Sequence, residues 1–165
     1  MSEDKKKLHM EKQQFSLKNM YFNRYLIVRY LTALFFFINL YWLICLSLSK
    51  SIWLWLPLAL IFGVIPVVAE QFQLYRKHQN NVPNTDRYFL IQGILNLVLM
   101  FVTVTPLFSG FFPFMNDDGQ GRVFISVLMA SGLLLCVFVR RRLKRIRTNR
   151  DKHYDRIQQY EKAVQ

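Results

Sequence analysis

Long apolar segments alternate with shorter polar ones along most of the chain. A helix needs roughly 20 apolar residues to cross the ~30 Å hydrocarbon core of a bilayer. The segments that lack Asp, Glu, Lys, Arg and His are Tyr30–Ser49, Ser51–Ala69, Tyr88–Asn116 and Val123–Val139. The third is too long for one crossing, and Pro106, Gly110 and Pro113 predict that its helix ends near Phe108. The pattern therefore predicts four transmembrane helices, near residues 28–48, 52–69, 88–108 and 122–139.

A soluble bundle of buried helices would give a different pattern. Each helix of a small soluble bundle keeps one face in water, which places polar residues at a period of about 3.6. The four segments are apolar all round, and hydrophobic residues make up 53% of the chain. We therefore predict an all-α integral membrane protein, with four transmembrane helices in an antiparallel up-down bundle.

Positive charge is concentrated in three regions between and around these helices. The chain has a net charge of +12. Twenty of its 22 Lys and Arg residues lie before or at the start of the first helix, between the second and third, or after the fourth. Only Lys50 and Arg122 lie in the two other connections. Because Lys and Arg stay on the cytoplasmic side of membrane helices, we expect a multi-pass protein of the cell membrane with both termini in the cytoplasm.

The predicted organisation has three parts. Residues 1–27 form a basic cytoplasmic tail that is partly helical, and residues 28–139 form the four-helix transmembrane domain. Residues 140–165 form a basic, amphipathic cytoplasmic helix. Aromatic residues at the predicted outer ends of the first two helices are typical of anchors in the headgroup zone: Tyr41, Trp42, Trp53 and Trp55.

The stretch CVFVRRRLKRIRTNRDK, residues 136–152, changes from apolar to basic within one residue. Each cation beside an anionic leaflet contributes about 1 kcal/mol of attraction. The chain has no recognisable nucleic-acid module, and no stacking aromatics are interleaved with these cations, so no nucleic-acid partner is expected. We predict that this polybasic tail contacts lipid headgroups or a protein partner through Arg140, Arg141, Arg142, Lys144, Arg145, Arg147 and Arg150.

A seven-residue repeat runs through the same region. Its positions are alternately three and four residues apart, which is the spacing of one helix face. The pattern fits a coiled-coil seam, an amphipathic helix lying on the membrane, or a solvated extension of the fourth helix. The residues of this stripe are Leu143, Ile146, Arg150, His153, Ile157, Tyr160 and Val164.

Polar residues inside the predicted helices are neutral. Asn39 lies in the middle of the first helix, and Gln92, Asn96 and Thr103 share one face of the third. Amides in hydrocarbon need hydrogen-bond partners, so we expect Asn39 and Asn96 to bond across a helix interface. The alternative is a polar strip that lines a ligand pocket or a pore.

Small residues and prolines predict how closely the helices approach and where they bend. Three pairs of small residues are four residues apart, a spacing that permits close packing: Ala59 and Gly63, Ser126 and Ala130, and Gly132 and Cys136. In the second helix, Pro57 and Pro66 flank Gly63, and these three residues predict a hinge or kink.

Candidate catalytic chemistry is sparse. No ionisable side chain lies in the interior of a predicted helix, in contrast to proton relays and ion-coupled transporters. The three His residues have no Cys or carboxylate at ligand spacing. The chain also lacks a Gly-rich phosphate loop and a nucleophile elbow. We therefore predict no catalytic residue, no metal site and no cofactor.

Three classes of function remain. The first is a noncatalytic accessory or regulatory subunit that binds a larger membrane or cytoplasmic partner through its basic tail and middle loop. The second is a subunit of an oligomeric channel, a small-solute carrier or a membrane immunity or permeabilising system. The third is a membrane enzyme with a cytoplasmic surface site that uses Glu70, His78 or Asp86. The lack of internal charge favours the first class, and the short loops disfavour the third. Expected partners are an anionic cytoplasmic leaflet and either a membrane protein or further copies of the chain.

Overall fold

All regular structure in residues 3–76 and 81–164, which the computed structural model describes, is helical. Four segments are long and apolar enough to cross a membrane: Leu26–Leu48, Ile52–Leu74, Pro83–Val102 and Gly119–Tyr160. The elements in chain order are α1 (Glu3–Asn23), α2 (Leu26–Leu48), η1 (Ile52–Leu54), α3 (Trp55–Arg76), α4 (Pro83–Val102), α5 (Phe108–Phe111), α6 (Gly119–Arg147) and α7 (Lys152–Val164).

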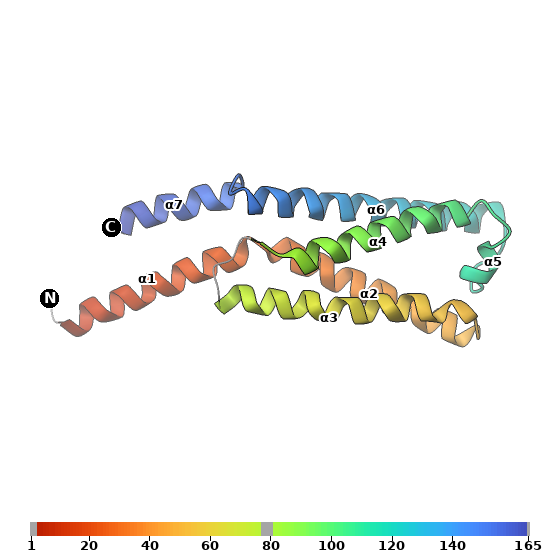
Figure 1. The fold of residues 1–165 in the computed structure, drawn as a ribbon, viewed down its shortest axis with the longest axis horizontal. Helices are drawn as coiled ribbons and strands as arrows, with labels where there is room; N and C mark the ends of the chain where they lie inside the picture. The colour runs from red at the N-terminus through yellow and green to blue at the C-terminus, as the bar shows by residue number, and fades with distance from the viewer. Residues whose placement is uncertain (1–2, 77–80, 165) are drawn as a thin grey trace.

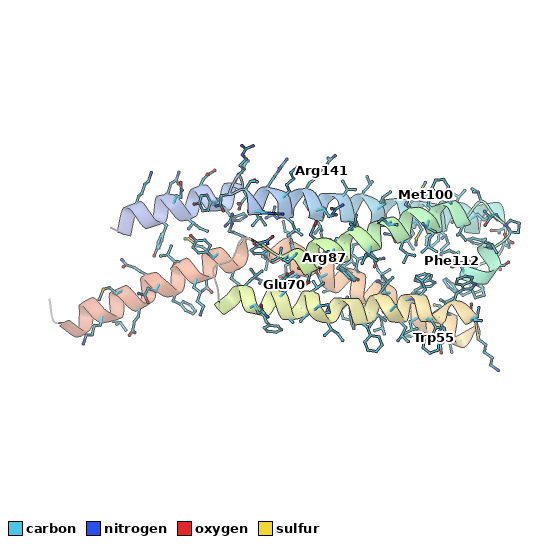
Figure 2. All side chains as sticks on the ribbon, in the orientation of Figure 1. Trp55, Glu70, Arg87, Met100, Phe112 and Arg141 are labelled. Carbon is cyan, nitrogen blue, oxygen red and sulfur yellow. The ribbon has the colours of Figure 1, made fainter. Side chains whose placement is uncertain are left out.

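The long helices lie roughly along one common axis, so the molecule is elongated and has two distinct ends (Figure 1). The connection from α2 to α3 and the α5 segment lie at one end, which we call the aromatic end. Helices α1 and α7 extend beyond the other end, which we call the basic end. Figure 2 shows side chains projecting from the outer faces of the long helices, with Trp55 near the aromatic end and Arg141 nearer the basic end.

The helix bounds differ from the prediction where polar residues continue a helix. The α3 helix runs to Arg76 and α6 runs to Arg147, each well beyond the last apolar residue of its segment. Lys and Arg are good helix formers, so charge marks the predicted membrane boundary without ending the helix. The α4 helix begins earlier than predicted, at Pro83, because Pro suits the first helical position.

The helix predicted as the third transmembrane segment, α4, ends at Val102, six residues before the predicted end at Phe108. Pro106 disfavours helical geometry at the residue before it. Arg122 Nη1 donates to the carbonyl oxygens of Thr103 (2.9 Å) and Thr105 (3.2 Å). A cation beside the carboxyl end of a helix also opposes the negative end of its dipole. Arg122, one of the two isolated cations in the sequence, therefore caps α4.

The basic segment 140–165 is not a single helix, because a turn at Asn149 separates α6 from α7. Asn149 adopts a φ of 54°, in the left-handed region that Asn tolerates better than most residues. The Asn149 N–H donates to the Ile146 carbonyl and the Arg150 N–H donates to the Arg145 carbonyl, both at 3.0 Å. This pair of hydrogen bonds is a Schellman motif, which ends α6.

The apolar stripe of the tail packs inside the molecule. Leu143, Ile146 and Ile157 are buried, and His153 and Tyr160 are half-buried, whereas Arg150 is exposed. The α7 helix contacts α1, which lies beside it at the basic end (Figure 1). Leu143 and Ile146 of α6 belong to the main hydrophobic core cluster, and the α7 part of the stripe belongs to the helix that lies against α1.

Aromatic side chains close the aromatic end. Trp42 is buried and its indole Nε1 donates to the Phe111 carbonyl at 3.3 Å. The Trp53 ring stacks on Phe111 with 3.9 Å between ring centroids. Tyr41 and Trp55 are exposed, as expected for anchors, but Trp42 serves the core.

Helices α4 and α6 form the closest pair. A methyl group at Gly93 would lie 3.3 Å from Cys136 Cβ, and one at Gly132 would lie 2.6 Å from Asn96 Nδ2. The absence of a side chain at Gly93 and Gly132 therefore leaves room for Cys136 and for the Asn96 amide. In α3, Pro57 lies in the first turn, Gly63 faces Tyr88, and Pro66 lies inside the continuous helix. A hinge at these positions stays a prediction.

Candidate functional site

Three amide side chains meet inside the bundle and form what we call the amide cluster: Asn39, Gln92 and Asn96. Asn39 Nδ2 on α2 donates to Gln92 Oε1 on α4 at 3.1 Å, and Gln92 Nε2 donates to Asn96 Oδ1 at 3.4 Å. The Tyr88 hydroxyl also donates to Gln92 Oε1, at 3.4 Å. All four side chains are buried. The prediction that amides link these two helices is correct, but the direct Asn39–Asn96 bond is wrong. Asn39 bonds instead to Gln92, which lies one turn before Asn96 on α4.

Thr103, the fourth predicted polar residue, lies apart from the amide cluster. It caps the end of α4, where its hydroxyl donates to the Met100 carbonyl at 2.7 Å. The same oxygen lies 2.7 Å from Ser126 Oγ on α6. Thr103 therefore ties α4 to α6 and does not continue a polar strip from the amides.

Two carboxylates near the basic end have structural partners. Glu70 on α3 accepts hydrogen bonds from the backbone N–H groups of Asn84 (3.0 Å) and Thr85 (2.8 Å) and from the Thr85 hydroxyl (2.7 Å). A carboxylate at a helix amino terminus also complements the positive end of the helix dipole, so Glu70 caps α4. Asp86 accepts from Arg140 Nε at 3.0 Å. His78 lies outside the described residues.

Arg24 connects the α1–α2 turn to the α6–α7 turn. In the sequence it is only one of many cations. It is fully buried at the turn between α1 and α2. Its guanidinium donates to both carboxylate oxygens of Asp151, to Asn149 Oδ1 at 3.2 Å and to the Ile146 carbonyl at 3.3 Å. Since burying a charge without partners is costly, Arg24 and the α6–α7 turn depend on each other.

Tyr25, the neighbour of Arg24, is also buried. Burial raises the pKa of the Tyr25 phenol to about 12, with Arg24 acting in the opposite direction. The phenol is therefore neutral at physiological pH, and it supplies no negative charge to compete with Asp151 for Arg24.

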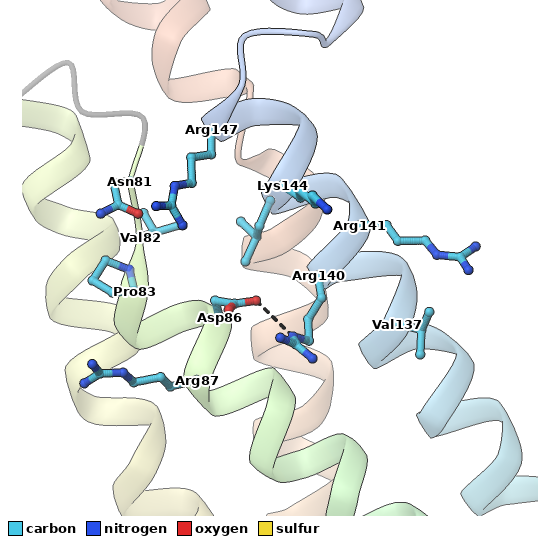
Figure 3. Close-up of a pocket in the computed structure, with 11 residues that line it drawn as sticks. Asn81, Val82, Pro83, Asp86, Arg87, Val137, Arg140, Arg141, Lys144 and Arg147 are labelled. Atoms are coloured by element: carbon cyan, nitrogen blue, oxygen red, sulfur yellow. Dashed lines mark hydrogen bonds and ion pairs between the residues drawn. The ribbon is translucent and has the colours of Figure 1, made fainter.

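A cavity of about 640 Å³ opens between the start of α4 and the basic part of α6 (Figure 3). We call it the basic groove. Five cations line it, against one carboxylate, Asp86. Apolar residues of both helices complete the wall. The lining cations are Arg87, Arg140, Arg141, Lys144 and Arg147, and the apolar residues are Val82, Pro83, Val137 and Leu143.

The predicted polybasic contact residues divide into two groups. Arg140, Arg141, Lys144 and Arg147 line the basic groove, because positions three and four apart share one face of α6. Arg142 is half-buried, and Arg145 and Arg150 are exposed, but none of these three lines the groove. Arg87, from the other side of the groove, was not among the predicted residues. Arg87 lies at least 53 residues before the α6 cations, so the sequence gives no signal that they are close together.

Among residues 3–76 and 81–164, no group of three or more His, Cys, Asp or Glu side chains could hold a metal ion.

Comparisons with protein families, with curated proteins and with solved structures found no match for this chain.

The hydrogen bonds of the amide cluster predict that Gln92→Leu destabilises the protein more than Asn96→Leu does. Replacing Gln92 by Leu removes the acceptor shared by Asn39 and Tyr88, and also the donor to Asn96. Replacing Asn96 by Leu removes only the end of the chain of hydrogen bonds. Polar contacts between membrane helices average about 0.6 kcal/mol and reach about 1–2 kcal/mol in model peptides. We expect the free energy of unfolding in detergent to fall by roughly 1–2 kcal/mol for Gln92→Leu and by roughly 0.6 kcal/mol for Asn96→Leu.

Ile94→Leu is the matched control on α4, because this side chain is exposed and its replacement conserves volume. Its unfolding should match that of the wild type. Equal losses for Gln92→Leu and Asn96→Leu, or none for either, would show that Gln92 is not the centre of the cluster.

Proposed function

We propose that this chain is a noncatalytic, multi-pass protein of the cell membrane that acts as an accessory or regulatory subunit of a larger membrane or cytoplasmic partner. In this proposal the four long helices form an antiparallel up-down bundle. The basic end faces the cytoplasm, with both termini on that side.

The observation that carries the proposal is the pair of helices α1 and α7, which contact each other and extend beyond the bundle. Buried Arg24 ties their junctions together through Asp151. Exposed cations lie on both helices, among them Lys12, Arg156 and Lys162, beside the exposed carboxylates Glu11 and Asp155. The two helices together carry eight Lys or Arg against five Asp or Glu, so their charge is positive. Such a fixed, positively charged surface complements an acidic surface on a partner and raises the rate of association.

The partners of the intramembrane amides and of the two candidate carboxylates support this class over the two others. The amides of Asn39, Gln92 and Asn96 bond to one another, which favours helix packing over a solute pathway. Glu70 and Asp86, the described carboxylates considered for an enzyme, are engaged by the start of α4 and by Arg140. Both arrangements support a role in which the fold presents a surface and performs no reaction.

Membrane orientation can be tested by cysteine labelling in a variant in which Cys45 and Cys136 are replaced by Ala. Ser109→Cys and Asn116→Cys place a thiol near the aromatic end, at exposed positions. We expect both to react with a membrane-impermeant thiol reagent on intact cells. Thr148→Cys, exposed at the end of α6, should react only after the membrane is permeabilised. Labelling with the opposite pattern would contradict the proposed orientation.

Partner binding can be tested by co-purification in mild detergent from the native host. The wild-type chain should retain a larger protein at a fixed stoichiometry. The triple variant Lys12→Gln/Arg156→Gln/Lys162→Gln removes three exposed cations of α1 and α7 and should lose most of that protein. Cations at the rim of an interface act mainly on the association rate, so the loss should be greatest at low salt.

The matched control removes three cations of the basic groove, through Arg141→Gln/Lys144→Gln/Arg147→Gln, and should keep the partner. Recovery of the wild type as a pure homo-oligomer would contradict the accessory role and favour an oligomeric channel or carrier. Retention of the partner by both triple variants would show that α1 and α7 do not form the contact.

A further inference from the structure

We infer that the basic groove binds the phosphate headgroup of an anionic phospholipid. The inference concerns the cavity between α4 and α6 and does not rest on the proposed partner, which would contact α1 and α7. It requires only that the long helices lie in a bilayer, so that the groove opens at the membrane boundary.

The charge of the groove calls for an anion from outside the chain. Its five cations and one carboxylate leave a net charge of +4. Asp86 pairs with Arg140, and both side chains are partly exposed, so this carboxylate is already engaged at one side of the cavity (Figure 3). In the part of the chain that the structure describes, Arg87, Arg141, Lys144 and Arg147 form no ion pair. Glu70, which lines the adjacent cavity of about 730 Å³, is used as the cap of α4.

The groups that surround the cavity suit a phosphate. Arg guanidinium groups recognise phosphate oxygens through two parallel hydrogen bonds, and Lys adds a compact charge. Figure 3 shows Arg147 from α6 reaching towards Asn81 and Val82 on the chain segment before α4. Asn81 is uncharged and can donate or accept, which suits the ester and hydroxyl oxygens of a headgroup.

The apolar wall distinguishes a lipid from a soluble phosphate. Val137 and Leu143 of α6 and Val82 and Pro83 at the start of α4 line the same cavity as the cations. Val137 belongs to the apolar part of α6 and is exposed. A ligand that spans the groove therefore places its charge among Arg and Lys and its hydrocarbon towards the bilayer. Basic pockets between membrane helices at a cytoplasmic boundary commonly hold anionic headgroups.

The test measures lipid binding to the full-length protein by native mass spectrometry, with phosphatidylglycerol and phosphatidylcholine added to the delipidated protein in detergent. The wild type should bind phosphatidylglycerol with at least tenfold higher affinity than phosphatidylcholine. The variant Arg141→Gln/Lys144→Gln/Arg147→Gln should lose that preference. A contribution of about fivefold in affinity for each cation predicts a loss on the order of a hundredfold at low salt.

A matched variant separates the groove from diffuse attraction to charge. Arg145→Gln/Arg150→Gln/Lys152→Gln removes the same number of exposed cations from the same region, but none of them lines the groove. It should keep the wild-type preference to within about threefold, because the groove cations remain in place. Equal losses in the two triple variants would overturn the inference in favour of nonspecific attraction, and no loss in the groove variant would overturn it outright.

A variant that is expected to bind the lipid more tightly is a further test, because misfolding would lower the affinity and could not raise it. Asp86→Asn removes the one lining carboxylate and releases Arg140, so affinity for phosphatidylglycerol should rise about fivefold. A fall or no change would contradict the electrostatic basis of the site.

Comparing phosphatidylglycerol with a soluble phosphate, glycerol 1-phosphate, distinguishes a lipid site from a site for a soluble phosphate. Glycerol 1-phosphate should bind at least tenfold more weakly than phosphatidylglycerol, because it cannot use the apolar wall. Val137→Ser should weaken the binding of the lipid and leave that of glycerol 1-phosphate unchanged. Equal affinity for both ligands, or no effect of Val137→Ser on the lipid, would show that the groove takes a soluble phosphate and would overturn the lipid assignment.

Discussion

Hydrocarbon offers no hydrogen bonds, so a chain whose long helices are apolar enough to cross a membrane must itself satisfy the polar groups that those helices carry. The amide cluster shows how this constraint builds the fold. Gln92 can accept and donate at once, and it therefore connects α2 to α4 through Asn39 and continues to Asn96. Asn96 in turn fits because Gly132 on α6 leaves room for its amide. A few neutral residues thus fix the positions of three helices relative to one another.

The same constraint applies to charge at the two ends of the bundle. Glu70 and Arg122 cap the beginning and the end of α4, each from another helix or its connection. Arg24 is buried completely and draws its partners from the α6–α7 turn. These residues serve the fold, whereas other cations of the basic end, such as Arg141, Lys144 and Lys12, line a cavity or lie exposed. The basic groove and the surface of α1 and α7 are two such sets.

Much of the fold could be predicted from the sequence, because length and composition decide whether a segment suits hydrocarbon. The four apolar helices follow from charge-free runs, and Pro106 correctly predicts that α4 ends before its apolar run does. The sequence could not reveal partners far apart in the chain. Arg24 reads as a topology signal until Asp151, 127 residues later, is seen beside it. Likewise, the polybasic tail appears uniform until helix periodicity and the position of Arg87 divide it into groove and surface. Asn39 was expected to pair with Asn96, because depth in the membrane suggests possible partners but cannot choose between two residues one turn apart.

We propose that the polar groups between the long helices hold these helices together and do not form a solute pathway. The most direct measurement is ion flux through the purified protein in liposomes that carry a membrane potential. If the amides serve helix packing, we expect flux no greater than that of empty liposomes, for the wild type and for Gln92→Leu alike. Sustained flux through the wild type that Gln92→Leu abolishes or alters in selectivity would contradict it.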